Sequence, residues 1–216
     1  REICTYYLNK NNTDIICLNI LGQCFFEEGN YDDSIKIFNN ILAIDPNNLS
    51  ALNSLGRIYH EKRDAENAEK KFLDALRIDR LSYHVVNNLA GFYRETGKYN
   101  KAIEYYLKAI SLNPNNPYIY NNLSKTYFDL NKHEDAKKSC FKALELKPDD
   151  GDIQKTLSFI YLKNHDYEDG WNYFDGRLNL DDFIKKNENV EKLNKKLFRK
   201  KVLNNSSGKF LVVREQ

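Results

Sequence analysis

Residues 49–82 read LSALNSLGRIYHEKRDAENAEKKFLDALRIDRLS, and the same pattern returns in residues 83–116 as YHVVNNLAGFYRETGKYNKAIEYYLKAISLNPNN. In each stretch a leucine is followed directly by a small residue and, four positions on, by an aromatic residue. The leucine recurs with a spacing of 34 residues, at Leu21, Leu55, Leu89, Leu123 and Leu157. A constant period of this length is the signature of a protein built from stacked structural repeats.

The 34-residue units are compared here by numbering the places within each one, counted from Ile15, Leu49, Tyr83, Pro117 and Gly151. Apolar or small residues at places 4, 7, 8 and 11 have the spacing of an amphipathic helix. Small residues at places 8 and 20 allow two helices to approach closely, and turn sequences such as Asp-Pro-Asn-Asn at 45–48 precede the next unit. Because one helix pair cannot bury its own apolar face, neighbouring pairs are expected to stack into a solenoid.

These residues at this spacing resemble the tetratricopeptide repeat. The resemblance implies that each unit is an antiparallel helix pair, with helix A in roughly the first 14 places and helix B after it. It implies an all-α, right-handed superhelix whose concave groove is lined by the free side of helix A. The predicted repeats span 15–48, 49–82, 83–116 and 117–150, with a degenerate fifth at 151–180 and the second half of a preceding repeat at 1–14.

The C-terminal part of the chain carries a second resemblance. The junction at which such repeats meet a heptosyltransferase-like glycosyltransferase domain is similar to Gly170, Trp171, Phe174 and Arg177, followed by Gly208, Lys209, Glu215 and Gln216. Residues 181–208 are predicted to form a basic linker or capping helix, and residues 209–216 the first strand of a truncated α/β domain. Since the chain starts without Met, we expect it to be the N-terminal recognition arm of a longer protein.

The composition favours a folded helical protein without a membrane span. Of 216 residues, 41% are hydrophobic and 30% charged, whereas 9 Gly and 4 Pro are too few for many short strands. No apolar run approaches the roughly 20 residues of a membrane-spanning helix. The net charge of +2 gives no general reason to bind nucleic acid, and the basic segment 185–201 has few aromatic residues for base stacking. Cysteines without metal-ligand or disulfide-framework spacing favour reduced thiols in a cytoplasmic protein.

No catalytic residue, metal site or cofactor is predicted for this chain. None of the histidines occurs in an HExxH pattern or beside a cysteine at ligand spacing; they are His60, His84, His133 and His165. The stretch 206–209 lacks the earlier Gly and the following Ser/Thr of a phosphate loop. Because no nucleophile and base stand out together, the chain itself is predicted not to be an enzyme.

A column of asparagines marks the candidate binding site. Place 5 is occupied in four successive units by Asn19, Asn53, Asn87 and Asn121, and in the fifth by Lys155. At about 100° per residue, this place points away from the apolar stripe of helix A. An amide side chain both donates and accepts hydrogen bonds, so the column is suited to pair with the backbone of an extended peptide of any sequence.

Cations beside the column extend this candidate site. Arg57, Arg94 and Lys125, at places 9 and 12, are predicted to select an acidic partner. The alternative is that they pair with the acidic residues of place 13 on a solvated face; these are Glu27, Glu61, Glu95 and Asp129.

The sequence thus predicts a non-catalytic scaffold that binds a protein or an extended peptide. Two alternatives stay open. In one, the chain belongs to a sugar-nucleotide-dependent glycosyltransferase whose catalytic domain follows residue 216, and the repeats present its acceptor. In the other, the repeats mediate self-association into a homo-oligomer.

Overall fold

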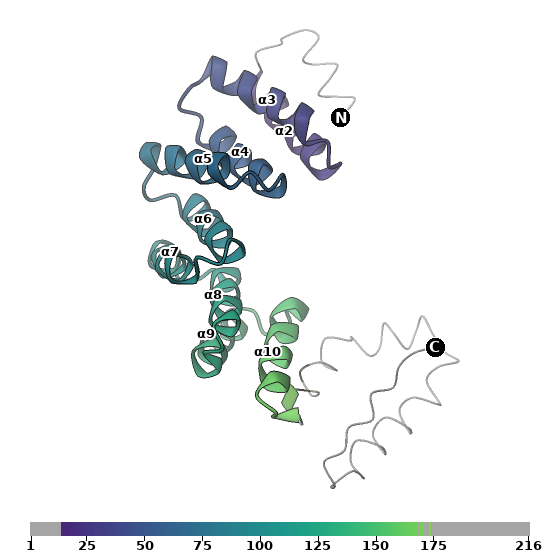
Figure 1. Ribbon diagram of the computed structural model, residues 1–216, viewed down its shortest axis with the longest axis vertical. Helices are drawn as coiled ribbons and strands as arrows, with labels where there is room; N and C mark the ends of the chain where they lie inside the picture. The colour runs from purple at the N-terminus through teal and green to yellow at the C-terminus, as the bar shows by residue number, and fades with distance from the viewer. Residues whose placement is uncertain (1–13, 168, 171–172, 174–216) are drawn as a thin grey trace, which may run out of the picture.

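The computed structural model describes residues 14–167, 169, 170 and 173 (Figure 1). In this part the chain forms nine complete α-helices and no strand. They are α2 (Ile15–Glu27), α3 (Tyr31–Ile44), α4 (Leu49–Glu61), α5 (Ala65–Ile78), α6 (Tyr83–Glu95), α7 (Tyr99–Leu112), α8 (Pro117–Asp129), α9 (His133–Leu146) and α10 (Gly151–Lys163). The expected all-α solenoid is confirmed. The half-repeat predicted before Ile15, the linker helix at 181–208 and the strand at 209–216 fall outside the described residues.

The helices alternate between two layers. We call α2, α4, α6, α8 and α10 the A helices, and α3, α5, α7 and α9 the B helices. Each B helix packs against the A helix before it and the A helix after it, and successive A helices also contact each other. In Figure 1, α5 and α7 lie to the left of α4 and α6, and both ends of the stack, α2 and α10, lie to the right of its middle. The A helices therefore lie along the inner side of the bend, which we call the inner face.

Short polar side chains define where most of these helices begin. In six of them the side chain at the N-cap accepts a hydrogen bond from a backbone N–H of the first turn; the caps are Asp14, Asn30, Asn48, Asp64, Asn116 and Asp150. Asn48 Oδ1, for example, accepts from the N–H of Ala51 at 3.0 Å. Such caps satisfy backbone donors that have no partner within the helix. Part of the asparagine content of the chain thus has a local structural cause.

The loop between helix A and helix B turns through one residue in the left-handed region. This residue occupies place 15 in every described repeat, with φ between 58° and 75°; it is Gly29, Arg63, Gly97, Asn131 or His165. A left-handed residue directly after a helix is a common way to end it, and glycine adopts this conformation without strain. The three side-chain-bearing residues adopt it at a cost.

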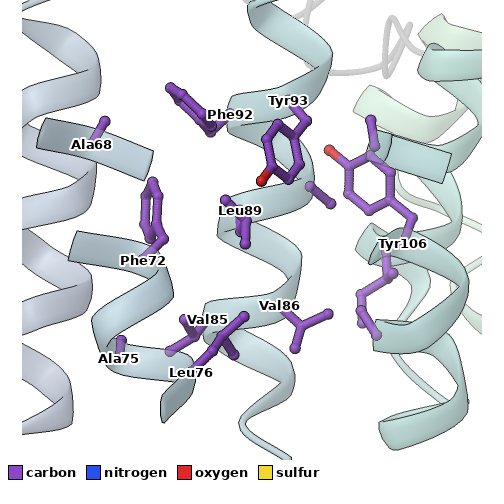
Figure 2. Packing of buried hydrophobic residues seen from close by; sticks show 14 of the residues in the cluster. Ala68, Phe72, Ala75, Leu76, Val85, Val86, Leu89, Phe92, Tyr93 and Tyr106 are labelled. Carbon is purple, nitrogen blue, oxygen red and sulfur yellow. The ribbon is translucent and has the colours of Figure 1, made fainter. Parts of the chain in front are cut away.

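The repeated leucine lies at the centre of the core. All five leucines of place 7 are buried, as are the residues of place 24 in four repeats: Phe38, Phe72, Tyr106 and Cys140. Figure 2 shows Phe72 of α5 turned toward α6, where Leu89 and Phe92 belong to the next repeat; the Phe72 and Phe92 ring centroids are 6.1 Å apart. Each layer of the core therefore joins two repeats, as a solenoid requires.

Helices A and B of one repeat approach most closely at the small residue of place 8. A Cβ added to Gly56 would lie only 2.7 Å from ring atoms of Phe72. Where place 8 is Ser124, its Oγ donates to the carbonyl oxygen of Ala136 in the paired helix at 2.8 Å. The crossing thus admits a hydrogen atom at Gly56, a methyl group at Ala90 or a hydroxyl group that bonds across it at Ser124.

We predict that Gly56→Ala lowers the free energy of unfolding by about 1–2 kcal/mol, because overpacking against Phe72 outweighs the gain in helix propensity. The matched control is Gly91→Ala, also within an A helix. Its added Cβ would meet nothing closer than the Tyr106 hydroxyl at 3.5 Å, so this change is expected to raise stability by roughly 0.5–1 kcal/mol. Urea unfolding followed by circular dichroism measures both, and equal effects would contradict the close-approach explanation.

A second pair of substitutions tests the loops. Arg63 has φ of 62°, so Arg63→Gly is expected to raise the free energy of unfolding by about 0.5–1 kcal/mol through relief of left-handed strain. Gly97→Ala, at the same place one repeat later with φ of 75°, should lower it by a similar amount. Thermal unfolding of the two variants checks the opposite signs.

Candidate functional site

The four asparagines of place 5 lie on successive A helices along the inner face. Asn19, Asn53 and Asn87 are partly buried, whereas Asn121 is only 3% exposed. Asn19 already has two hydrogen-bond partners. Its Nδ2 donates to the carbonyl oxygen of Ile15 at 2.9 Å, and its Oδ1 accepts from Ser50 Oγ at 3.3 Å.

The middle of the column is a ladder of amides that crosses from repeat to repeat. Asn53 Oδ1 accepts a hydrogen bond from Asn88 Nδ2 at 3.0 Å, and Asn87 Oδ1 accepts from Asn122 Nδ2 at 3.5 Å. The donors occupy place 6 of the next A helix, and the sequence analysis missed them. The signal was present, since Asn-Asn pairs stand at 87–88 and 121–122.

The ladder stops at Asn121. In the next repeat place 6 is Thr156, whose hydroxyl donates within its own helix to the carbonyl oxygen of Asp152 at 2.9 Å. Asn121 Oδ1 is consequently buried without a hydrogen-bond partner. A buried polar atom in this state is rare and costs free energy, so its position marks an unusual point on the inner face.

The amide groups of the column also retain donors. Asn53 and Asn87 accept through Oδ1, and their Nδ2 groups make no hydrogen bond to any residue that the structure describes. Both side chains are only partly buried. The column therefore offers N–H groups at intervals of one repeat, while its carbonyl oxygens are used to connect neighbouring repeats.

The predicted cations differ in how they are engaged. Arg94 Nε donates to Asp129 Oδ2 of the next repeat at 3.0 Å. Arg57 lies over the Phe26 ring, with its guanidinium carbon 4.8 Å from the ring centroid. Lys125 has no carboxylate within ion-pair distance among residues 14–167, 169, 170 and 173. Of the three, Arg94 is already neutralised.

Place 12 of one repeat generally contacts place 13 of the next. Besides Arg94 and Asp129, His60 Nε2 lies 3.2 Å from Glu95 Oε2. Lys163 Nζ lies 4.6 Å from the centroid of Phe128. An acid of place 13 thus forms an ion pair with Arg94 in one repeat and contacts the His60 imidazole in another. The Arg94 pair is what the solvated-face alternative expects.

Arg94 also lies beside a buried tyrosine at place 24 of its own repeat. Burial raises the pKa of Tyr106 to about 12, although the Arg94 guanidinium acts in the opposite direction. A tyrosine hydroxyl with this pKa stays protonated at neutral pH.

The thiol of Cys140 is also protonated at neutral pH. Cys140 is fully buried in the core, its Sγ lies 3.4 Å from the carbonyl oxygen of Ile153, and burial raises the pKa of its thiol to about 12. A thiol that remains protonated is a poor nucleophile and a poor metal ligand. In the part of the chain that the structure covers, no three His, Cys, Asp or Glu side chains gather in a group that could hold a metal ion.

Gly170 has a packing role within the repeat. An added Cβ would lie 2.7 Å from side-chain atoms of Leu162, and its carbonyl oxygen accepts from Ser158 Oγ at 2.7 Å. It thus fills the small-residue place 20. The other residues that carry the glycosyltransferase resemblance, Trp171, Phe174, Arg177 and those at 208–216, lie outside the described residues.

The fold and its inner face define an α-helical repeat protein. Three family models match the chain: a tetratricopeptide repeat model at residues 13–80, a TPR repeat model at 92–131 and a second tetratricopeptide repeat model at 117–150. Together they cover more than half of the sequence, and the chain belongs to the tetratricopeptide repeat family.

Solved structures are similar in fold. A structure titled as a functional characterisation of pilF from Pseudomonas aeruginosa aligns with a TM-score of 0.70 at 21% identity, covering 89% of this chain and 93% of that one. A crystal structure of MamA aligns with 0.64 at 22% identity, covering 76% and 96%. MamA from Desulfovibrio magneticus RS-1 aligns with 0.65 at 15% identity, covering 77% and 94%. No curated protein matches the sequence significantly. Among the described helices, none has the length and apolar character needed to cross a membrane.

The ladder predicts a contrast in stability between two asparagines. Asn53→Ala leaves the partly buried Asn88 amide without its acceptor and should lower the free energy of unfolding by about 1 kcal/mol. Asn121→Ala removes a carbonyl that has no partner, so it should cost clearly less, although this side chain is the more deeply buried. Chemical unfolding of the two variants measures the difference. A larger loss for Asn121→Ala would mean that its Oδ1 has a donor.

Proposed function

We propose that this protein binds an extended segment of a partner protein along the inner face, with the asparagine column contacting the backbone of that segment. The observation that carries the proposal is the orientation of the column. Asn53 and Asn87 use their carbonyl oxygens within the stack and keep their Nδ2 groups without a described partner. These donors match the carbonyl oxygens of a peptide backbone, so the contact would not depend on the peptide's sequence.

The spacing of the repeats suits an extended ligand. Packed helices lie roughly 8–10 Å apart, and an extended chain advances about 3.3 Å per residue. One repeat therefore corresponds to about three peptide residues. In an extended chain of the polyproline II form three residues make one turn, so every third carbonyl oxygen points the same way and can meet one donor per repeat. The side chains between these contacts are left to meet the residues at places 9 and 12.

Tetratricopeptide repeats serve as protein-interaction scaffolds, and this role is consistent with the proposal. No residue described on the inner face suggests catalysis by this chain. The same peptide contact would also serve the alternative in which the repeats present an acceptor protein to a glycosyltransferase domain beyond Gln216. Apart from Gly170, the residues that suggest that domain lie outside the described part of the chain, so the domain stays a prediction. Self-association remains a second alternative, and sedimentation of the purified chain across concentration distinguishes it.

The test is a selection of peptides from a displayed random library on the purified chain, followed by affinity measurements with the selected peptides. The triple variant Asn53→Ala, Asn87→Ala and Asn121→Ala is expected to weaken binding by about tenfold or more, because each lost hydrogen bond contributes roughly 0.5–1.5 kcal/mol.

The matched control is the double variant Asn88→Ala and Asn122→Ala. It breaks the same amide ladder between repeats but keeps the column itself, so peptide affinity should stay within about twofold of the wild type. Circular dichroism verifies that both variants are folded. Equal affinity of the triple variant and the wild type, or equal loss in both variants, would refute backbone recognition by the column.

A further inference from the structure

The charge of the inner face changes sign along the stack. In the first three repeats, places 5, 9, 12 and 13 carry three acidic residues, Glu27, Glu61 and Glu95, and two cations, Arg57 and Arg94. In the last two repeats the same places carry Lys125, Lys155 and Lys163 against Asp129 alone. The fifth repeat replaces the asparagine of place 5 and the acid of place 13 by lysine, so the inner face is positive at its α8 and α10 end.

The ion pairs reinforce this difference. Asp129, the one acid at these four places in the last two repeats, is paired with Arg94 of the preceding repeat at 3.0 Å. Lys125, Lys155 and Lys163 have no carboxylate within 4.0 Å among the residues that the structure describes. Elsewhere lysines do find such partners: Lys98 lies 3.0 Å from Glu69 and Lys137 lies 3.1 Å from Asp166. Other lysines, such as Lys70 and Lys108 on the B helices, also have no such partner among the described residues. What distinguishes this end of the inner face is that three such lysines occupy places 5, 9 and 13 of two neighbouring repeats.

Aromatic rings lie beside two of these lysines. Lys163 Nζ of α10 is 4.6 Å from the centroid of Phe128 of α8, and Lys155 Nζ is 5.8 Å from the centroid of Phe159 on its own helix. Phe159 is 44% exposed, an unusual state for a phenylalanine side chain. Asn121, whose buried Oδ1 has no donor, lies one helical turn before Lys125 on α8.

We propose that Lys125, Lys155, Lys163, Phe128 and Phe159 form a subsite, the α8–α10 subsite, that holds an acidic stretch of the bound peptide containing an aromatic residue. The inference rests on the proposed peptide binding and adds the ligand's chemistry and direction. Three cations without a carboxylate partner among the described residues attract neighbouring carboxylates, and the rings of the exposed Phe159 and the partly buried Phe128 beside them cover an apolar side chain. The acidic part of the ligand then lies at α10, and the part toward α2 faces Glu27 and Glu61.

The proposal assigns the selection of an acidic ligand to a different part of the inner face from the one that the sequence predicted. The sequence placed it on Arg57, Arg94 and Lys125. Since Arg94 is paired with Asp129 and Arg57 belongs to the second repeat, away from α8 and α10, only Lys125 of the three belongs to the subsite.

The test uses defined probes on the full chain. A rhodamine-labelled peptide Asp-Glu-Trp-Glu-Asp, blocked at both ends, is compared by fluorescence anisotropy with its uncharged counterpart Asn-Gln-Trp-Gln-Asn. The acidic peptide is expected to bind at least tenfold more tightly at low salt, and the preference should shrink at high salt because the charges lie near solvent.

The subsite variant carries Lys125→Gln, Lys155→Gln and Lys163→Gln. It should abolish the preference, a loss of roughly tenfold at about twofold for each exposed charge pair. The matched control carries Lys70→Gln, Lys108→Gln and Lys138→Gln, three exposed lysines on the B helices α5, α7 and α9. It makes the same change in net charge and should keep the preference. A carbodiimide, which joins carboxylates to lysine amines, should cross-link the acidic peptide to the three subsite lysines.

The first two outcomes below separate this inference from the proposed function. If both peptides bind equally, or if the control loses the preference as fully as the subsite variant, the α8–α10 subsite is wrong while peptide binding stands. If the acidic preference depends on the three lysines but the asparagine triple variant binds both peptides normally, the subsite stands and backbone recognition by the column falls. If neither peptide binds at millimolar concentration, both are wrong.

Discussion

The close approach of helices A and B within one repeat is the constraint on which the rest of this structure depends. At Gly56 the crossing leaves no room for a Cβ beside Phe72. The ring of Phe72 therefore fills the space within its own repeat and also faces α6, where it meets Phe92 of the next repeat (Figure 2). Because the same rings serve both contacts, no helix pair completes its core alone, and stability is shared between neighbours.

The same constraint makes the inner face regular. When every helix pair crosses in the same way, a given place on each A helix faces the same direction, and residues 34 positions apart line up. This alignment turns isolated asparagines into a ladder in which Asn88 donates to Asn53 and Asn122 to Asn87. The ladder has a direction, since carbonyl oxygens are used between repeats and Nδ2 groups remain on the face. It ends where Thr156 directs its hydroxyl into its own helix.

Charge is distributed by the same alignment. Contacts between place 12 and place 13 engage the acids in the middle of the inner face, as in the ion pair of Arg94 with Asp129 and the contact of His60 with Glu95. In the fifth repeat the acid of place 13 is replaced by Lys163, which lies against Phe128 instead. The two ends of the inner face therefore differ in charge, because the repeats are regular except for the fifth. This difference is the basis of the α8–α10 subsite proposed above.

The sequence by itself determined the helices and the core. The 34-residue period predicted where the A helices begin, and the residues of places 7 and 24 are buried as their apolar character indicates. These features follow from helical periodicity and local turn chemistry, which act within a few residues of the chain.

The candidate site was predicted only in outline. The column of asparagines was visible, but whether an amide donates to a ligand or accepts from a neighbour was not. Only the tertiary structure decided that Asn88 donates to Asn53 and that Arg94 pairs with Asp129, because each contact joins residues 35 positions apart. Such contacts depend on how successive A helices stack. A repeat period in the sequence predicts which helices are neighbours, but it does not predict which of their side chains contact each other.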